Sequence, residues 1–348
     1  MKKAIIVLII ILLSGCYDYD ELTDLGIVSS MIIDYDEEYT VNLEILETSA
    51  KTDNTSYFIE GKGETFEFAL QNAYTKSTKH IYLNHLYSLI LNKDVLNNHL
   101  KEIYDFFLID ADVKKDTFFV FCDNTAELKE YKSEDGLSLG ETIKNIIHYN
   151  ERENGNFKSF KFSEILHARL NSNNYIIGGI DVNDDVLSLQ GSYIIENDKP
   201  KLLLEEEVIL FINILKNQKT EFLIFTKSGT FEIYNYTLKE NIEKDLITIT
   251  FNADARFFGY IKNANFKISD LSNIEKEISK NLNQYFANCI NYSIDNSTDI
   301  YNFDYFYYLH YPKKSYKGIY KEIKYDIKTD VKLNEKGLLL NDIGVLKK

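Results

Sequence analysis

"LGIVSSMIID", residues 25–34, and "YTVNLEILETS", residues 39–49, decide the fold at the start of this chain. Both runs are rich in Ile, Val and other apolar residues, as β-strands are. The acidic stretch Asp34–Glu38 lies between them and interrupts the apolar pattern. The sequence therefore predicts two strands joined by an acidic turn.

The next part of the chain alternates between helix and strand patterns. Gly61-Lys62-Gly63 interrupts the chain, and a helix is predicted from Thr65, a candidate N-cap, to Tyr74. A second helix is predicted in "DVLNNHLKEIYDFFL", residues 94–108, because its apolar residues share one face at helical spacing. Further predicted elements are the strands "HLYSLIL" (85–91) and "DTFFVFCD" (116–123) and short helices near 125–132, 140–152 and 163–171. This alternation predicts a mixed sheet with helices packed on it.

From Tyr175 onward, strand patterns predominate. A long helix interrupts them, with Ser269 or Asp270 as the predicted first residue and Ser272 and Glu275 as a candidate capping box. The predicted strands are "YIIGGIDV" (175–182), "VLSLQGSYIIEND" (186–198), "PKLLLEE" (200–206), "EFLIFTK" (221–227), "TFEIYNYTL" (230–238), "LITITFNADARFF" (246–258), "DYFYYLHY" (304–311) and "EIKYDIKTDVKLN" (322–334). The three runs from 221 to 258 are predicted to form an antiparallel meander, after a helical piece at 208–216.

The predicted fold class is therefore α+β, a multi-domain chain of mixed α/β regions with sheets flanked by helices. The C-terminal domain is expected to be rich in antiparallel strands and to carry the one long helix. The pattern changes near residues 175–190, so we expect an N-terminal region at 16–180 and a C-terminal domain at 181–348.

The charge of the chain excludes one class of partner. Its 348 residues carry 54 acidic and 39 basic side chains, a net charge of −15 at pH 7. Such a surface repels phosphate backbones, and the basic residues are interleaved with acidic ones along the sequence. We expect no nucleic-acid binding and no attachment to an anionic membrane by charge alone.

The first sixteen residues have the pattern of an export signal. Met1-Lys2-Lys3 is basic, and the apolar run Ala4–Leu13 is too short to span a bilayer, which takes about 20 residues. Leu13-Ser14-Gly15-Cys16 resembles the lipobox of bacterial lipoproteins, in which the Cys thiol is diacylated and the chain is cut just before it. The alternative is a simple signal peptide followed by an unrelated cysteine. We expect Cys16 to be the lipidated residue and residues 1–15 to be the signal peptide.

The sequence contains no convincing catalytic or metal motif. Gly61-Lys62-Gly63-Glu64-Thr65 lacks the spacing of a phosphate loop, and Asp181–Asp185 lacks the later Gly and Glu of a calcium loop. Cys122 and Cys289 lie in apolar surroundings and are expected to be buried free thiols, with a disulfide between them as the alternative. The six histidines are scattered: His80, His85, His99, His148, His167 and His310. We predict no enzyme, no cofactor and no metal.

Several blocks in order resemble the Ger(x)C family, the lipoprotein C subunits of GerA-type spore germinant receptors. The first block is "CYDYDELTDLGIVSSMIIDYDEEYTVNLEIL", with Cys16, Tyr17, Asp18, Glu21, Leu22, Leu25–Val28 and Ile33-Asp34 at matching positions. The second is "GKGETFEFALQNA…KHIYLNHLYSLILNKDVL", with Gly63, Thr65, Ala69, His85, Leu86, Ile90 and Leu91. "FFLIDADVKKDTFFVF", the helix Leu271–Ile290, Asp299 and "HYPKKSYKG" follow in the same order. The chain departs from the family where Tyr17 and Tyr316 replace Trp and where "IYNFDYFYYL" replaces a Gly-containing motif.

The resemblance implies three mixed α/β domains, the first two within the N-terminal half. It also implies a non-enzymatic subunit that assembles with membrane-embedded A and B subunits on the outer leaflet side of the spore inner membrane, in a complex that responds to nutrients. Two alternatives stay open at this point: a solute-binding lipoprotein of a nutrient importer, and a lipid-anchored hydrolase.

Overall fold

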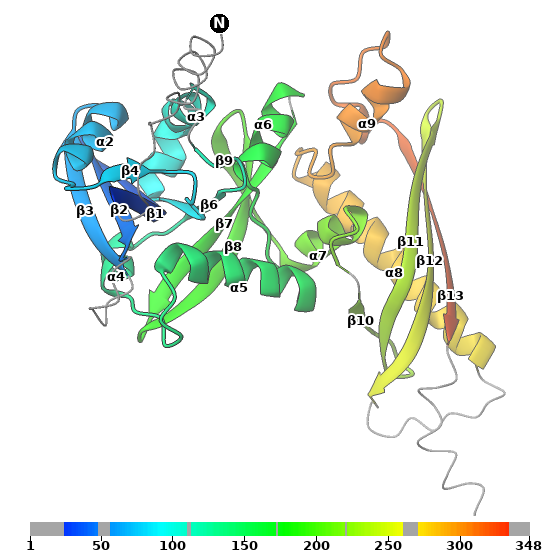
Figure 1. Cartoon of the computed structure of the whole chain (residues 1–348). Helices are drawn as coiled ribbons and strands as arrows, with labels where there is room; N and C mark the ends of the chain where they lie inside the picture. The colour runs from blue at the N-terminus through cyan, green and yellow to red at the C-terminus, as the bar shows by residue number, and fades with distance from the viewer. Residues whose placement is uncertain are drawn as a thin grey trace, which may run out of the picture.

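A computed structural model describes residues 24–47, 56–109, 113–171, 173–219, 221–259 and 271–333. The chain forms two units that lie side by side (Figure 1). The first is built on a nine-stranded sheet with helices on both faces, and the second on a four-stranded sheet with one long helix against it. This arrangement confirms the predicted mixture of α and β structure.

The first sheet contains β1 (Leu25–Asp36), β2 (Glu38–Leu46), β3 (Ser56–Gly63), β4 (His80–Tyr82), β5 (Ser88–Leu91), β6 (Phe118–Phe121), β7 (Tyr175–Asn183), β8 (Val186–Glu196) and β9 (Lys199–Leu204). Its order is β3-β2-β1-β5-β6-β7-β8-β9, and β4 pairs with the beginning of β1. The four central strands β1, β5, β6 and β7 are parallel, whereas the flanking pairs are antiparallel. The two opening strands form the predicted pair, and Glu37 makes their tight turn in the left-handed region.

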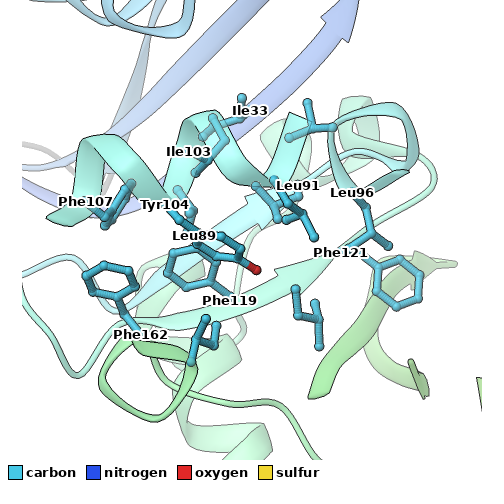
Figure 2. Packing of buried hydrophobic residues seen from close by; sticks show 14 of the residues in the cluster. Ile33, Leu89, Leu91, Leu96, Ile103, Tyr104, Phe107, Phe119, Phe121 and Phe162 are labelled. Atoms are coloured by element: carbon cyan, nitrogen blue, oxygen red, sulfur yellow. The ribbon is translucent and has the colours of Figure 1, made fainter. Parts of the chain in front are cut away.

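The helices of the first unit are α2 (Phe66–Thr75), the π-helical turn η2 (Val95–His99), α3 (Leu100–Ile109), α4 (Thr125–Glu130), α5 (Leu139–Glu153) and α6 (Phe162–Leu170). Residues of α2, α3 and α6 pack on one face of the sheet, and residues of α4 and α5 pack on the other. Figure 2 shows the first of these layers, where Ile103, Tyr104 and Phe107 of α3 lie over Leu89 and Phe119 of the sheet. Because both faces are covered, every residue of β5 and β6 is buried.

The second unit begins with α7 (Glu206–Leu215) and continues with β10 (Phe222–Phe225), β11 (Thr230–Glu243), β12 (Leu246–Gly259), α8 (Leu271–Asp295), α9 (Phe303–His310), the 3₁₀ turn η4 (Ile319–Lys321) and β13 (Lys324–Leu333). The strand order is β10-β11-β12-β13. The first three strands form the predicted antiparallel meander, and β13 is parallel to β12. α8 covers one face of this sheet with side chains at steps of four, namely Ile274, Ile278, Leu282 and Phe286, and a step of three follows to Cys289.

Most predicted elements are present, and one was assigned to the wrong class. "DYFYYLHY" forms the helix α9 instead of a strand. The backbone N–H groups of Phe303 and Asp304 donate to the two carboxylate oxygens of Asp299 at 2.9 Å, which caps the helix. Phe303 and Tyr307 are then buried one helical turn apart. The predicted start of the long helix at Ser269 or Asp270 lies outside the described residues.

α7 joins the two units through both hydrophobic cores. Val208, Ile209 and Ile212 pack in the first core, whereas Phe211 and Ile214 pack in the second. The first sheet continues through β8 and β9 up to this helix, so the strands of the N-terminal half form one sheet. The expected division at 180/181 falls inside β7 and stays a prediction, as do the two subdomains of the N-terminal region.

Candidate functional site

Cys16, the one residue that the sequence singles out as functional, lies outside the described residues. The structure begins at Asp24, just before β1, and Leu25 at the start of β1 pairs with His80 of β4. Within the described ranges, no helix combines the length and the apolar content that crossing a bilayer requires.

The two other cysteines are unsuited to thiol chemistry. Cys122 follows β6, Cys289 lies in α8, and both are buried free thiols, as expected. Burial raises the pKa of each thiol to about 12. Since the thiolate is the nucleophile and metal ligand, neither cysteine is reactive at neutral pH.

The motif-like stretches have structural roles. A Cβ atom at Gly61 would lie 2.1 Å from the carbonyl oxygen of Ala69, so the glycine of β3 permits the close approach of α2. Asp184 and Asp185 adopt left-handed backbone angles in the turn between β7 and β8. Among the described residues, no group of His, Cys, Asp and Glu side chains is placed to hold a metal ion.

A polar cleft with a volume of about 530 Å³ lies beside β2 and β3 in the first unit. We call it the β2–β3 cleft; residues 129–133 at the end of α4 form its opposite wall. Asn42 lines the cleft, is 1% exposed, and its Nδ2 atom has no hydrogen-bond partner. The aromatic side chains of Tyr57 and Tyr131 and the amine of Lys129 also line it, so the cleft offers polar and aromatic contacts.

Glu44 organises the inner end of this cleft. Its buried carboxylate accepts hydrogen bonds from Ser30 Oγ and Ser56 Oγ, both at 2.8 Å, and from the backbone N–H groups of Leu139 at 2.7 Å and Gly140 at 3.1 Å. The last two are the first residues of α5, so Glu44 caps that helix and compensates its positive end. Four donors occupy the carboxylate, which anchors the first turn of α5 to β2.

A second set of buried polar groups joins the two units next to α7. The Lys158 amine lies 2.6 Å from Glu151 Oε1 and 2.8 Å from Gln218 Oε1. Asn213 of α7 donates to the carbonyl oxygen of Gly155 at 2.9 Å. These bonds fix α7 to the segment after α5, and they would be costly to break because the groups are buried.

The comparisons with known proteins agree with this architecture. Residues 18–182 match the family described as "Spore germination protein N-terminal domain", and residues 190–337 match "Spore germination B3/GerAC like, C-terminal". The chain belongs to the Ger(x)C family of spore germination proteins. No curated protein matches this Ger(x)C chain.

The Ger(x)C fold is also seen in a solved structure. The crystal structure of the GerBC protein superposes with a TM-score of 0.55 at 14% sequence identity, over 87% of this chain and 96% of that one. At this identity the likeness concerns the fold. Sequence reasoning identified the family, whereas Asn42 and Glu44 were missed because no local signal shows that α5 begins beside them.

Proposed function

We propose that this chain is the lipid-anchored, non-enzymatic C subunit of a nutrient germinant receptor and is needed for spore germination. The observation that carries the proposal is the pair of family matches in order along the chain, with Cys16 only two residues before the first of them. In this proposal, acylated Cys16 holds the folded units on the outer leaflet side of the spore inner membrane.

The partners of the proposed subunit are the membrane-embedded A and B subunits of the receptor. A role in binding and not in catalysis is consistent with the side chains described above. The thiols of Cys122 and Cys289 are protonated at neutral pH, and the Glu44 carboxylate is fully occupied by donors. In this proposal the folded units bind their partners through their surfaces, and the packing of α7 in both hydrophobic cores holds the two units together.

The lipid anchor is tested by replacing Cys16. Cys16→Ser removes the thiol that is acylated, so the variant is expected to fold and to leave the membrane fraction for the soluble fraction. The physical reason is that two acyl chains give stable attachment, at about 0.8 kcal/mol for each buried CH₂ group. Fractionation of cells that lack the A and B subunits, with circular dichroism of the recovered protein, measures both properties.

Cys289→Ala serves as the matched control, because it also removes a thiol but leaves the acylation site intact. It is expected to stay in the membrane fraction. A Cys16→Ser protein that remains membrane-bound without its partners would contradict the anchor. Spores carrying Cys16→Ser are then expected to respond more weakly to nutrients than spores carrying the control.

The fold does not favour the alternative of a solute-binding lipoprotein. Such proteins close two lobes around a ligand by a hinge movement. Here the second unit is a four-stranded, largely antiparallel sheet, and α7 packs into both hydrophobic cores, which fixes the two units to each other.

A further inference from the structure

One surface of the second unit differs in charge from the rest of this acidic chain. We call residues 303–317 the α9 segment; it comprises α9 and the loop that follows. This segment and the residues that follow it up to Lys324 contain five lysines and two acidic residues, whereas acidic residues outnumber basic ones in the whole chain. One of the two acids, Asp304, is directed inward and accepts hydrogen bonds from the backbone N–H groups of Gly318 and Tyr320.

The exposed side chains of the α9 segment are aromatic, aliphatic and basic. Tyr308 and Leu309 of α9 are exposed, as are Lys313, Lys314 and Lys317 in the loop. Within the part of the chain that the structure describes, no carboxylate forms an ion pair with these three lysines. Tyrosines with lysines beside them are typical of the interface between water and a bilayer.

The α9 segment lies on the same side of the molecule as the start of β1. The parallel strands β1, β5, β6 and β7 begin at one edge of the first sheet, which we call the starting edge. Asn174, just before β7, donates to the carbonyl oxygen of Asp299, which leads into α9, at 3.1 Å. Figure 1 shows α3, α6 and α9 along this common side.

The starting edge also carries the two most exposed aliphatic side chains among the described residues. Ile109, at the end of α3, is 85% exposed, and Leu170, at the end of α6, is 84% exposed. α3 runs from the end of β5 back towards the start of β6, whereas α6 begins at this edge, where the Phe162 N–H donates to the Thr117 carbonyl, and ends before β7. Isolated apolar residues on a surface are ordinary, but these lie on the side that carries the basic segment.

The proposed lipid anchor would hold this side close to the bilayer. Seven residues separate Cys16 from Asp24. An extended chain covers at most about 3.5 Å per residue, so Asp24 stays within roughly 28 Å of the acylated residue. This short tether gives the starting edge a high effective concentration at the membrane surface.

We propose that the α9 segment is a second membrane contact, in which Lys313, Lys314 and Lys317 bind anionic phospholipid headgroups and Tyr308 and Leu309 enter the interface. The contact rests on the proposed lipid anchor and adds an orientation to it: the starting edge faces the bilayer. Charge complementarity selects an anionic lipid surface as the occupant, because the segment is basic in a chain of net charge −15.

The test places a fluorescent probe on the full lipidated chain, reconstituted in vesicles of phosphatidylcholine and phosphatidylglycerol. Leu309→Cys carries the probe, and Val186→Cys is the matched control. The two positions are similarly exposed, at 57% and 63%, and Val186 lies at the turn between β7 and β8, at the opposite end of β7 from the starting edge. Cys122 and Cys289 are buried and stay unlabelled. Lipids with a spin-labelled headgroup report contact by quenching.

We expect quenching of the probe at 309 and little quenching at 186. Neutralising Lys313, Lys314 and Lys317 to Gln is expected to weaken the contact roughly fivefold for each lysine removed. As a control, the same change is made at three exposed lysines of the first unit, Lys62, Lys93 and Lys132. It is expected to leave the quenching at 309 unchanged.

The contradicting results are distinct from a failure of the anchor. Vesicle-bound protein with equal quenching at 309 and 186 overturns the second contact and leaves the lipid anchor intact. If the probe at position 309 becomes buried only after the A and B subunits are added, the second membrane contact is also overturned, because the α9 segment would then bind protein. Protein that does not float with the vesicles overturns the anchor itself and, with it, this inference.

Discussion

The two sheets of this molecule bury their strands in different ways. In the first sheet, β5 and β6 are buried on both faces, because helices cover each side. In the second sheet, β12 alternates between buried and more exposed residues over most of its length, because α8 covers one face. The difference follows from the connections: parallel strands need crossover helices, which cover the sheet, whereas hairpins leave one face open.

The strongest test of this contrast compares neighbouring residues in each sheet. Leu89 and Ile90 of β5 are fully buried on opposite faces, so Leu89→Ala and Ile90→Ala should each lower the free energy of unfolding by about 2–5 kcal/mol. In β12, Phe251→Ala should cost about 3–5 kcal/mol, whereas Asn252→Ala should change stability by less than about 0.5 kcal/mol. Urea unfolding of the full chain measures all four. An Ile90→Ala variant as stable as Asn252→Ala would show that one face of β5 is open.

A second, smaller effect concerns the anchoring of helices to the first sheet. Glu44→Ala removes the acceptor of two side-chain hydroxyls and of the N–H groups of Leu139 and Gly140, and should cost about 2–3 kcal/mol. Glu60→Ala is the matched control on the same cleft, because this exposed glutamate has only a loose ion pair with Lys129 at 3.9 Å. Equal stabilities of the two variants would refute the capping role of Glu44.

The second unit also caps a helix with a buried carboxylate, and here the effect depends on pH. Burial raises the pKa of Asp299 to about 7, and the neighbouring Asp304 carboxylate contributes in the same direction, while the N–H donors of α9 oppose it. The unfolded chain loses this proton near pH 4 but the folded chain keeps it until about pH 7. The contribution of Asp299 to stability is therefore fully present below pH 4 and is lost as the pH rises through about 7.

Asp299→Asn should remove this loss of stability, which in the wild-type protein is on the order of 2 kcal/mol in the free energy of unfolding between pH 5 and pH 7.5. Thermal or urea unfolding of the second unit at these two pH values measures it. Asp330→Asn, at an exposed position of β13, is the control and should keep the wild-type dependence on pH. If Asp299→Asn kept it too, another group would be responsible.

Much of the fold is predictable from the sequence because its signals are local. The opening strands follow from apolar runs around an acidic turn, and the side chain of Thr65 accepts from the Phe68 N–H as the predicted N-cap of α2. α9 was predicted as a strand because its apolar residues are nearly continuous, and its cap lies before it at Asp299.

The features missed by sequence reasoning depend on distant contacts. Glu44 caps a helix that begins 95 residues later, so the neighbouring sequence carries no trace of the contact. The basic surface of the α9 segment was also missed, because only the structure shows that Asp304 is directed inward and that the lysines are exposed beside Tyr308 and Leu309. The resemblance to a family identified the Ger(x)C chain although local patterns of charge and apolar residues could not, because the resemblance depends on the order of motifs along the whole sequence.

The central claim is that this chain acts as the anchored C subunit of a germinant receptor. The most direct test is purification of the tagged chain from detergent-solubilised spore membranes, with identification of every chain that accompanies it. The account predicts that an A and a B subunit co-purify with it in constant proportion. Recovery of the chain alone, from membranes that contain both subunits, would contradict the account.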